Sequence, residues 1–155
     1  MLFRSLTTAQ LVALYTNQLA AIETLDLLAL GSRQVPALTS SQIDALTTAQ
    51  IASLSTTQVA SLTTAQLSML KSDDIGSLSS TQIGALTTVQ VAALSTAQLR
   101  AIQTDDIAGL SSRQIALLGT DQVNALSTAS FAALSGTQVG AFTTDRKSTR
   151  LNSSH

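Results

Sequence analysis

An apolar residue recurs every eight residues from Leu6 to Leu134, and this spacing limits the possible folds more than any other feature of the chain. We call it position one of an octad. Seventeen octads follow one another, and Phe142 begins an eighteenth. The consensus is L-[ST]-[ST]-x-Q-[VIL]-x-[AS], with Gln at position five in thirteen octads and an apolar residue at position six in all of them. Such tandem repeats typically form one supersecondary unit each and bury a shared core by stacking.

An eight-residue period excludes one continuous helix and one continuous strand. A helix advances ~100° per residue, so positions one and six would drift around its surface and leave no stable apolar stripe. In a strand, positions one and six are an odd number of residues apart and would face opposite sides. The chain must therefore break its secondary structure once in every octad.

The residues around the break predict a helix start. Ser or Thr at position two and Gln at position five form the pattern S/T-x-x-Q, which is a capping box, and positions one and six then form a hydrophobic staple. Helices this short are not stable alone in water. We therefore expect an all-α solenoid of very short helices, one per octad, each contacting mainly its neighbours. Stacking would bury positions one, six and eight together.

Several octads depart from this pattern, and four of them bear on the helix start. Three of them have Asp at position five and no hydroxyl at position two, and they pair Glu23 with Asp26, Lys71 with Asp74 and Gln103 with Asp106. There the Ser or Thr at position three is expected to be the cap, so that the helix begins one residue later. The fourth octad contains Pro36, which lacks a backbone donor and predicts an irregular or barely helical octad.

A β-solenoid is the alternative fold, because Val, Ile and Thr favour strands. The region has few Gly, one Pro, and no Asn-Gly or Asp-Gly turn. Ala at position eight and Gln at position five suit helices better. The helical solenoid is therefore the favoured prediction.

The two ends of the chain do not continue the repeat. Residues 145–155 and 1–5 resemble the translated ends of a sequencing adapter, and we expect them to be artefacts, with a disordered C-terminal tail. Residues 6–144 then form a single solenoid that is an internal slice of a longer protein. This region has four basic and eight acidic residues, a net charge of 4 − 8 = −4, whereas the whole chain carries −1.

Residues 6–144 offer little catalytic chemistry. They contain no His and no Cys, so no base partner for a hydroxyl nucleophile and no zinc-ligand pattern is present. The pairs Asp73–Asp74 and Asp105–Asp106 suggest calcium, but two adjacent carboxylates do not supply its six to eight oxygen ligands. We interpret them as acidic residues in the first turns of helices. No enzyme activity, cofactor or metal site is predicted.

The glutamines of position five are the candidate binding residues. A regular solenoid would align them as a surface ladder able to bind a repetitive ligand, and the favoured alternative is that they serve the capping boxes and stack their side chains between octads. The ladder comprises Gln10, Gln18, Gln34, Gln42, Gln50, Gln58, Gln66, Gln82, Gln90, Gln98, Gln114, Gln122 and Gln138.

The octads resemble two known kinds of repeat. The segment Ala45-Leu46-Thr47-Thr48-Ala49-Gln50-Ile51 is similar to the A-L-T-T-x-Q-V arrays of large bacterial proteins described as haem-utilisation or adhesion proteins. Residues 6–14, LTTAQLVAL, are similar to the first helix of transcription-activator-like effector repeats. The first resemblance implies a bacterial surface or secreted adhesin-like scaffold, and the second implies a DNA-binding solenoid, which normally needs a basic surface.

We therefore expect a non-catalytic structural or interaction array, from a surface or secreted bacterial protein. The alternative is an intracellular solenoid that binds protein or nucleic acid. The partner is unknown, and a protein or cell-surface ligand is favoured over nucleic acid. No segment approaches the ~18 apolar residues of a membrane-spanning helix. End-to-end self-association through uncapped solenoid ends is a further expectation.

Overall fold

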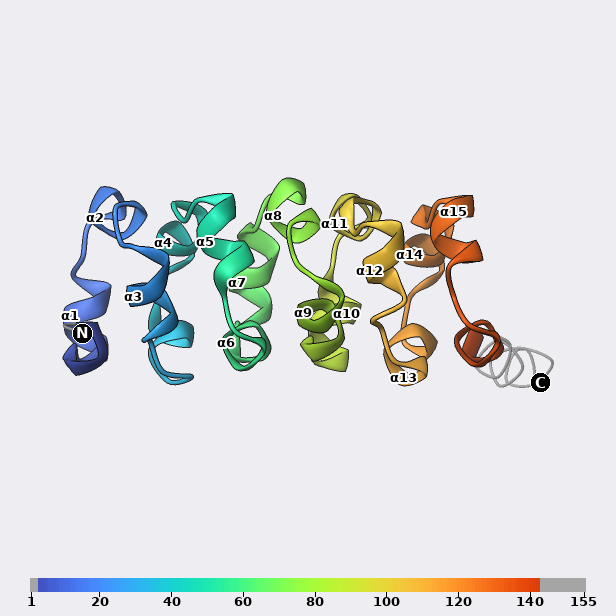
Figure 1. The fold of residues 1–155 in the computed structure, drawn as a ribbon, viewed down its shortest axis with the longest axis horizontal. Helices are drawn as coiled ribbons and strands as arrows, with labels where there is room; N and C mark the ends of the chain where they lie inside the picture. The colour runs from blue at the N-terminus through green and yellow to red at the C-terminus, as the bar shows by residue number, and fades with distance from the viewer. Residues whose placement is uncertain (1–2, 143–155) are drawn as a thin grey trace, which may run out of the picture.

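Each of the seventeen octads contains one short helix in the computed structural model, which describes residues 3–142. The chain winds these helices into an elongated solenoid, with residues 3–5 at one end of the described rod and residues 136–142 at the other (Figure 1). The described residues contain no strand. The prediction of an all-α solenoid is confirmed, and the β-solenoid alternative is wrong.

The α-helices have four to six residues each. They are α1 (Thr8–Val12), α2 (Thr16–Ala20), α3 (Thr24–Leu28), α4 (Ser40–Asp44), α5 (Thr48–Ser53), α6 (Thr56–Ser61), α7 (Thr64–Met69), α8 (Ser72–Gly76), α9 (Ser80–Ala85), α10 (Thr88–Ala93), α11 (Thr96–Ala101), α12 (Thr104–Ile107), α13 (Ser112–Ala116), α14 (Thr120–Ala125) and α15 (Thr128–Ala132). Two 3-10 helices, η1 (Phe3–Ser5) and η2 (Val35–Ala37), share the same path, and residues 136–142 are also helical.

Position two is the N-cap of the helix in the regular octads. Thr7 is extended, with φ −69° and ψ 159°, and its hydroxyl accepts a hydrogen bond from the backbone N–H of Gln10. In return, the backbone N–H of Thr7 donates to Oε1 of Gln10 at 2.9 Å. These two bonds satisfy two donors that the helix itself leaves unpaired.

Most of the α-helices end at position seven or eight, and the C-cap that follows lies at position eight or at position one of the next octad. The backbone N–H of Leu54, at position one, donates to the carbonyl of Ile51, and Leu54 is then extended with φ −57° and ψ 138°. Position two is extended as well, so two consecutive extended residues make the corner. No residue from 3 to 142 has a positive φ. The corners therefore need no glycine, although many helices end on one.

The three octads with Asp at position five keep the same helix start. Their N-caps are Glu23, Lys71 and Gln103, all extended and all at position two. The prediction that these helices begin one residue later is wrong. In α8 the physical reason is visible, because the carboxylate of Asp74 accepts from the backbone N–H of Lys71 at 3.1 Å. Position five thus holds the register without a hydroxyl at position two.

The octad that contains Pro36 is irregular, as predicted. It forms only η2, with Pro36 in its first turn, where the missing backbone donor is tolerated. The side chain of Val35 in this octad is still buried. The proline therefore shortens the helix and leaves the core position filled.

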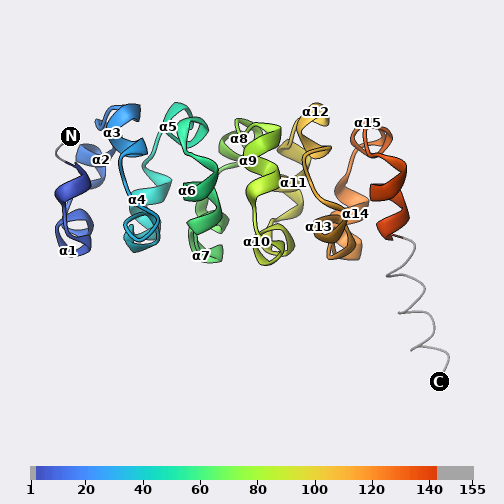
Figure 2. The same cartoon turned by 60° about the horizontal axis from the view of Figure 1, so that its bottom comes forward.

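Helices three octads apart in the sequence pack against each other. α4 contacts α7, α8 contacts α11, and α12 contacts α15. Figure 2 shows these successive turns side by side along the rod. The prediction that each helix contacts mainly its sequence neighbours is therefore corrected. The repeating unit of packing is a superhelical turn of between three and four octads.

Positions one and six form a core that runs along the rod. Position-six side chains such as Leu67 and Ile83 are fully buried, and position-one side chains such as Leu70 and Leu94 are nearly so. Position eight is mostly half-buried or exposed, so its predicted burial is wrong in most octads. The turns approach closely beside it, because a Cβ on Gly76, at position seven, would lie 2.8 Å from the carbonyl oxygen of Ala101, at position eight of the next turn.

The ends predicted to be adapter-derived are only partly described. Met1, Leu2 and residues 145–155 lie outside the described residues. Phe3–Ser5 are described, and η1 packs against α3 in the place of a preceding turn.

Candidate functional site

The side chain of Gln98 connects two turns of the solenoid. Its Nε2 donates to the carbonyls of Leu67 and Leu70, at 2.9 Å and 2.8 Å, in the preceding turn. Its Oε1 accepts from the backbone N–H of Ser95 at 3.0 Å. The amide therefore caps its own helix and also binds the last turn and the C-cap of α7 in the preceding turn. We call this arrangement a glutamine bridge.

The glutamine bridge repeats along the described chain with one register. Eleven of the thirteen position-five glutamines donate to the carbonyl of the residue 28 positions earlier, and most also donate to a carbonyl 30 or 31 positions earlier. They are Gln34, Gln42, Gln50, Gln58, Gln66, Gln82, Gln90, Gln98, Gln114, Gln122 and Gln138.

The prediction of a surface ladder is wrong for these residues. Ten of the eleven are buried, and Gln34 is partly buried. Every buried side-chain nitrogen or oxygen of the described residues has a hydrogen-bond partner. A buried amide is stable only when its donors and acceptor are paired, which these bridges achieve. The glutamines therefore form a ladder inside the seam between turns, and that ladder is inaccessible to a ligand.

Gln10 and Gln18 differ from the other glutamines of the ladder. Both are exposed, and each Oε1 accepts from the N-cap backbone at 2.9 Å, from Thr7 and Tyr15 respectively. Their Nε2 groups donate to no atom of residues 3–142. These two glutamines complete the cap and make no bridge.

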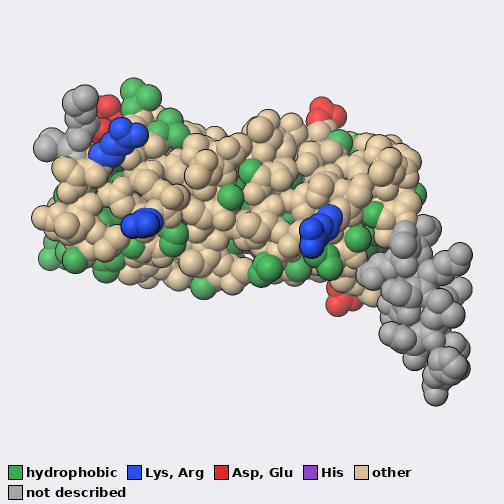
Figure 3. All heavy atoms as spheres, turned by 90° about the horizontal axis from the view of Figure 1, so that it is seen from below, with side chains coloured by type: hydrophobic (Ala, Val, Ile, Leu, Met, Phe, Trp, Pro, Cys, Tyr) green, Lys and Arg blue, Asp and Glu red, His purple; other side chains and the backbone are tan. Residues whose placement is uncertain are grey.

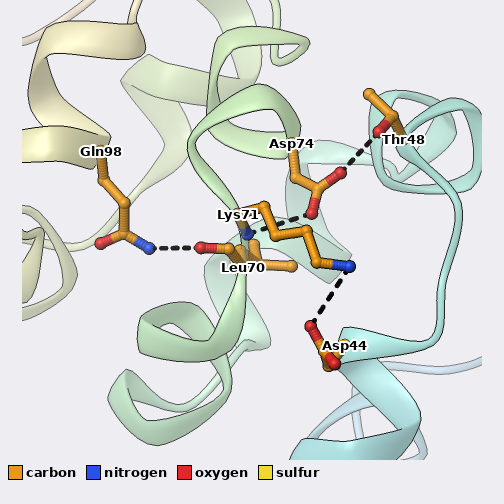
Figure 4. A network of polar contacts seen from close by, with 6 residues as sticks. All are labelled: Asp44, Thr48, Leu70, Lys71, Asp74 and Gln98. Atoms are coloured by element: carbon orange, nitrogen blue, oxygen red, sulfur yellow. Dashed lines mark hydrogen bonds and ion pairs between the residues drawn. The ribbon is translucent and has the colours of Figure 1, made fainter.

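Asp74 reverses the polarity of the bridge. A carboxylate cannot donate, so Asp74 accepts from the hydroxyl of Thr48 in the preceding turn at 2.8 Å, and from the backbone of Lys71 (Figure 4). Thr48 occupies position three of its octad. Among the described residues, Thr48 is the only position-three residue whose hydroxyl makes a hydrogen bond.

In the octads of Asp74 and Asp106, the residue at position two donates to the preceding turn, which the carboxylate at position five cannot do. Lys71 Nζ lies 3.5 Å from Oδ1 of Asp44, which occupies position seven in the preceding turn (Figure 4). Gln103 Nε2 donates at 3.1 Å to the carbonyl of Gly76, also at position seven. The long side chain at position two thus compensates in part for the donor missing at position five.

A shallow groove of about 420 Å³ lies between α8 and α11, near these exceptions. Ser72, Asp73, Gly76, Ser77, Ala101 and Gln103 line it. The hydroxyl of Ser77 donates to the carbonyl of Asp74, and the amide of Gln103 is engaged with Gly76. The groove therefore offers one free acid, Asp73, and no set of convergent groups suited to catalysis.

The paired acids do not converge on a metal. Asp73 is exposed, whereas Asp74 is buried and bonded to Thr48. No group of three or more His, Cys, Asp or Glu able to hold a metal occurs in the part of the chain that the structure describes. That same part contains no helix long and apolar enough to cross a bilayer.

Uncharged polar side chains and backbone cover most of the face drawn in Figure 3. Figure 3 shows one face with separate basic and acidic side chains and small apolar spots. Arg100 donates its Nε to the carbonyl of Ala125, and Lys71 is paired with Asp44. The face drawn in Figure 3 carries no extended basic stripe of the kind that binds a nucleic-acid backbone.

The octad pattern and its one-helix geometry agree with a known repeat. A family model for the ALTTAQ repeat matches residues 19–56, 67–101 and 99–136. The chain belongs to the ALTTAQ repeat family. The matched segments cover residues 19–136 except residues 57–66, so the ALTTAQ repeat accounts for most of the rod. No curated protein and no solved structure matches the chain.

The burial of the ALTTAQ glutamine was not foreseen, although the sequence carries a signal for it. Glu would cap a helix at position five equally well and would suit the helix dipole better. No octad has Glu there, and thirteen have Gln. The absence of Glu indicates that this position needs a donor as well as an acceptor.

Proposed function

We propose that this ALTTAQ array is a non-catalytic rod that holds other parts of a protein, or a bound partner, at a fixed spacing. The observation that carries this proposal is the glutamine bridge, which joins the octads from that of Gln34 to that of Gln138 to the preceding turn. The exceptions are the three octads with Asp74, Asp106 or Ser130 at position five. A core that continues along the whole rod supports the same role. Nearest-neighbour interfaces of this kind give solenoids their regular, extended form.

The finer proposal is that the rod is part of a bacterial surface or secreted protein with an adhesin-like role. Its support is the resemblance of Ala45–Ile51 to the arrays of such proteins, together with a net acidic, mostly uncharged surface. A nucleic-acid-binding solenoid is not favoured, because two of the basic side chains, Lys71 and Arg100, already have partners on the rod.

The test of the rod is the width of its end-to-end distance distribution. The chain has no Cys, so Ala9→Cys and Ala97→Cys, both at exposed position four, allow specific labelling for single-molecule energy transfer. We expect one narrow distribution. Gln66→Ala, which removes a bridge between the labels, should broaden it, and Gln18→Ala, at a position without a bridge, should not. A broad distribution in the parent protein would contradict the proposal.

A further inference from the structure

The groove between α8 and α11 lies in the middle of the rod, with further turns of the solenoid on both sides of it. It has a volume of about 420 Å³. Its lining includes Gly76 and Ala101, at which the two turns touch and neither of which has a side chain beyond Cβ. The groove is therefore a feature of the packed rod and is set by the contact of two complete turns.

The donors in the groove lining are already used within the rod. The hydroxyl of Ser77 donates to the carbonyl of Asp74 at 2.7 Å, and Nε2 of Gln103 donates to a carbonyl of the preceding turn at 3.1 Å. In contrast, the carboxylate of Asp73 and Oε1 of Gln103 bind no atom of residues 3–142. The hydroxyl of Ser72 is also unpaired in that range, and it can accept as readily as it donates. The groove therefore presents mainly acceptors, one of them charged.

The basic side chains nearest to Asp73 in the sequence have other partners. Lys71 Nζ lies 3.5 Å from Oδ1 of Asp44, and Nε of Arg100 donates to the carbonyl of Ala125 at 3.2 Å. Asp73 itself is exposed and has no ion-pair partner in the part of the chain that the structure describes. Its charge is therefore available to a cation from outside the rod.

The helix that follows Gln103 adds to this excess of acceptors. Asp106 in α12 is half-buried, and its carboxylate accepts no hydrogen bond from the described residues. A glutamine at this position would donate to the carbonyl of Leu78, 28 positions earlier, which receives no hydrogen bond within residues 3–142. Two more acceptors thus lack a donor within three residues of the groove lining.

We propose that this groove binds the guanidinium of an arginine side chain from a partner protein. A guanidinium carries five N–H donors in one plane and no acceptor, which complements a lining of acceptors. It pairs with the carboxylate of Asp73 through two parallel hydrogen bonds, and Oε1 of Gln103 accepts a further N–H. An ammonium is a compact point charge with three donors and matches such a lining less well. A partner bound here is held at one place along an otherwise repetitive array.

The experiment is a nuclear magnetic resonance titration of the full, isotope-labelled chain with the capped tripeptide Ala-Arg-Ala. We expect saturable shifts of the backbone amides of residues 72–77 and 101–106. Asp73→Asn removes the charge and keeps the shape, so it should weaken binding by roughly threefold to tenfold. Asp121→Asn is the matched control, because Asp121 is exposed at the same octad position and lies outside the groove. It should leave the affinity unchanged.

The capped tripeptide Ala-Lys-Ala and calcium chloride test the other occupants. The lysine peptide should bind more weakly than the arginine peptide, and calcium should leave these amides unshifted. Equal affinity for the lysine peptide, or saturable shifts with calcium, would overturn the assignment to arginine. Shifts scattered along the rod, or equal weakening by Asp73→Asn and Asp121→Asn, would overturn the groove as a site.

A binding groove is more than the spacer role requires, because a rod without one would still hold a fixed spacing. The two experiments therefore fail independently. A narrow end-to-end distance distribution without binding in the groove would reject the arginine site and leave the rod in place. A broad distribution with saturable binding at residues 72–77 would do the reverse.

Discussion

The hydroxyl of Thr48 donates to the carboxylate of Asp74 between two adjacent turns of the rod. In the regular octads the donor is instead the glutamine of the later turn. Twenty-six residues separate the two, and α5 and α8 pack directly against each other. This pair replaces the bridge with a bond of reversed direction. It shows that the contact between turns requires a donor and an acceptor, and that either turn can supply the donor.

Thr48→Val should destabilise the protein by about 1–3 kcal/mol, because it leaves one oxygen of the buried Asp74 carboxylate without its donor. The measurement is the free energy of unfolding by urea titration. Thr56→Val is the matched control, since Thr56 has the same octad position and its hydroxyl makes no hydrogen bond among residues 3–142. It should change stability by less than about 0.5 kcal/mol. Equal losses in both variants would contradict the role of the pair.

Gln98→Ala should cost roughly 2–4 kcal/mol, since it removes two bonds to carbonyls of the preceding turn and one cap bond, and leaves a cavity. Gln18→Ala should cost at most about 1 kcal/mol, because this residue makes the cap bond alone. Thermal or urea unfolding of the two variants checks the difference. Similar losses would indicate that the inter-turn bonds contribute little.

Gln98→Glu should make stability depend on pH with a defined sign. Burial beside two carbonyls disfavours the carboxylate, so the pKa of the new side chain should lie above its unfolded value of about 4.3. The folded state then binds more protons than the unfolded state. The variant should be most stable below that unfolded pKa and lose stability as pH rises toward the raised folded pKa. Urea titrations from pH 4 to 8, compared with the parent protein, test this, and a flat difference would contradict it.

Gly84→Ala should destabilise the rod by about 1–3 kcal/mol, because the added Cβ would lie 2.7 Å from the carbonyl oxygen of Gly109 in the next turn. Gly140→Ala is the matched change at the same octad position. Apart from its chain neighbours and its own helix, no described residue has an atom within 4 Å of its added Cβ, so the helix propensity of Ala should stabilise it by up to about 1 kcal/mol. Opposite signs in the two melting temperatures would support the close approach at Gly84.

Local chemistry made much of the fold predictable, and long-range geometry made the rest unpredictable. Thr7 and Gln10 identify the helix start because capping depends on residues three apart. The burial of Leu11 follows from the eight-residue period. The partner of Gln98, in contrast, lies 28 residues earlier, and nothing within an octad reports how many octads make one turn. The Asp octads were misread because position two was judged by its hydroxyl, while Asp74 holds the cap from the other side.

The fixed register of the bridge has a consequence for how such genes change. Each bridging glutamine donates to the carbonyl of the residue 28 positions earlier, and the octads are nearly interchangeable. Gaining or losing a whole octad therefore leaves every later glutamine amide with backbone carbonyls to bind. The same event turns everything beyond it by between about a quarter and a third of a revolution about the rod axis. The number of octads can therefore change while the chain still folds. Each octad gained or lost alters both the length of the array and the direction about the rod axis in which its far end points.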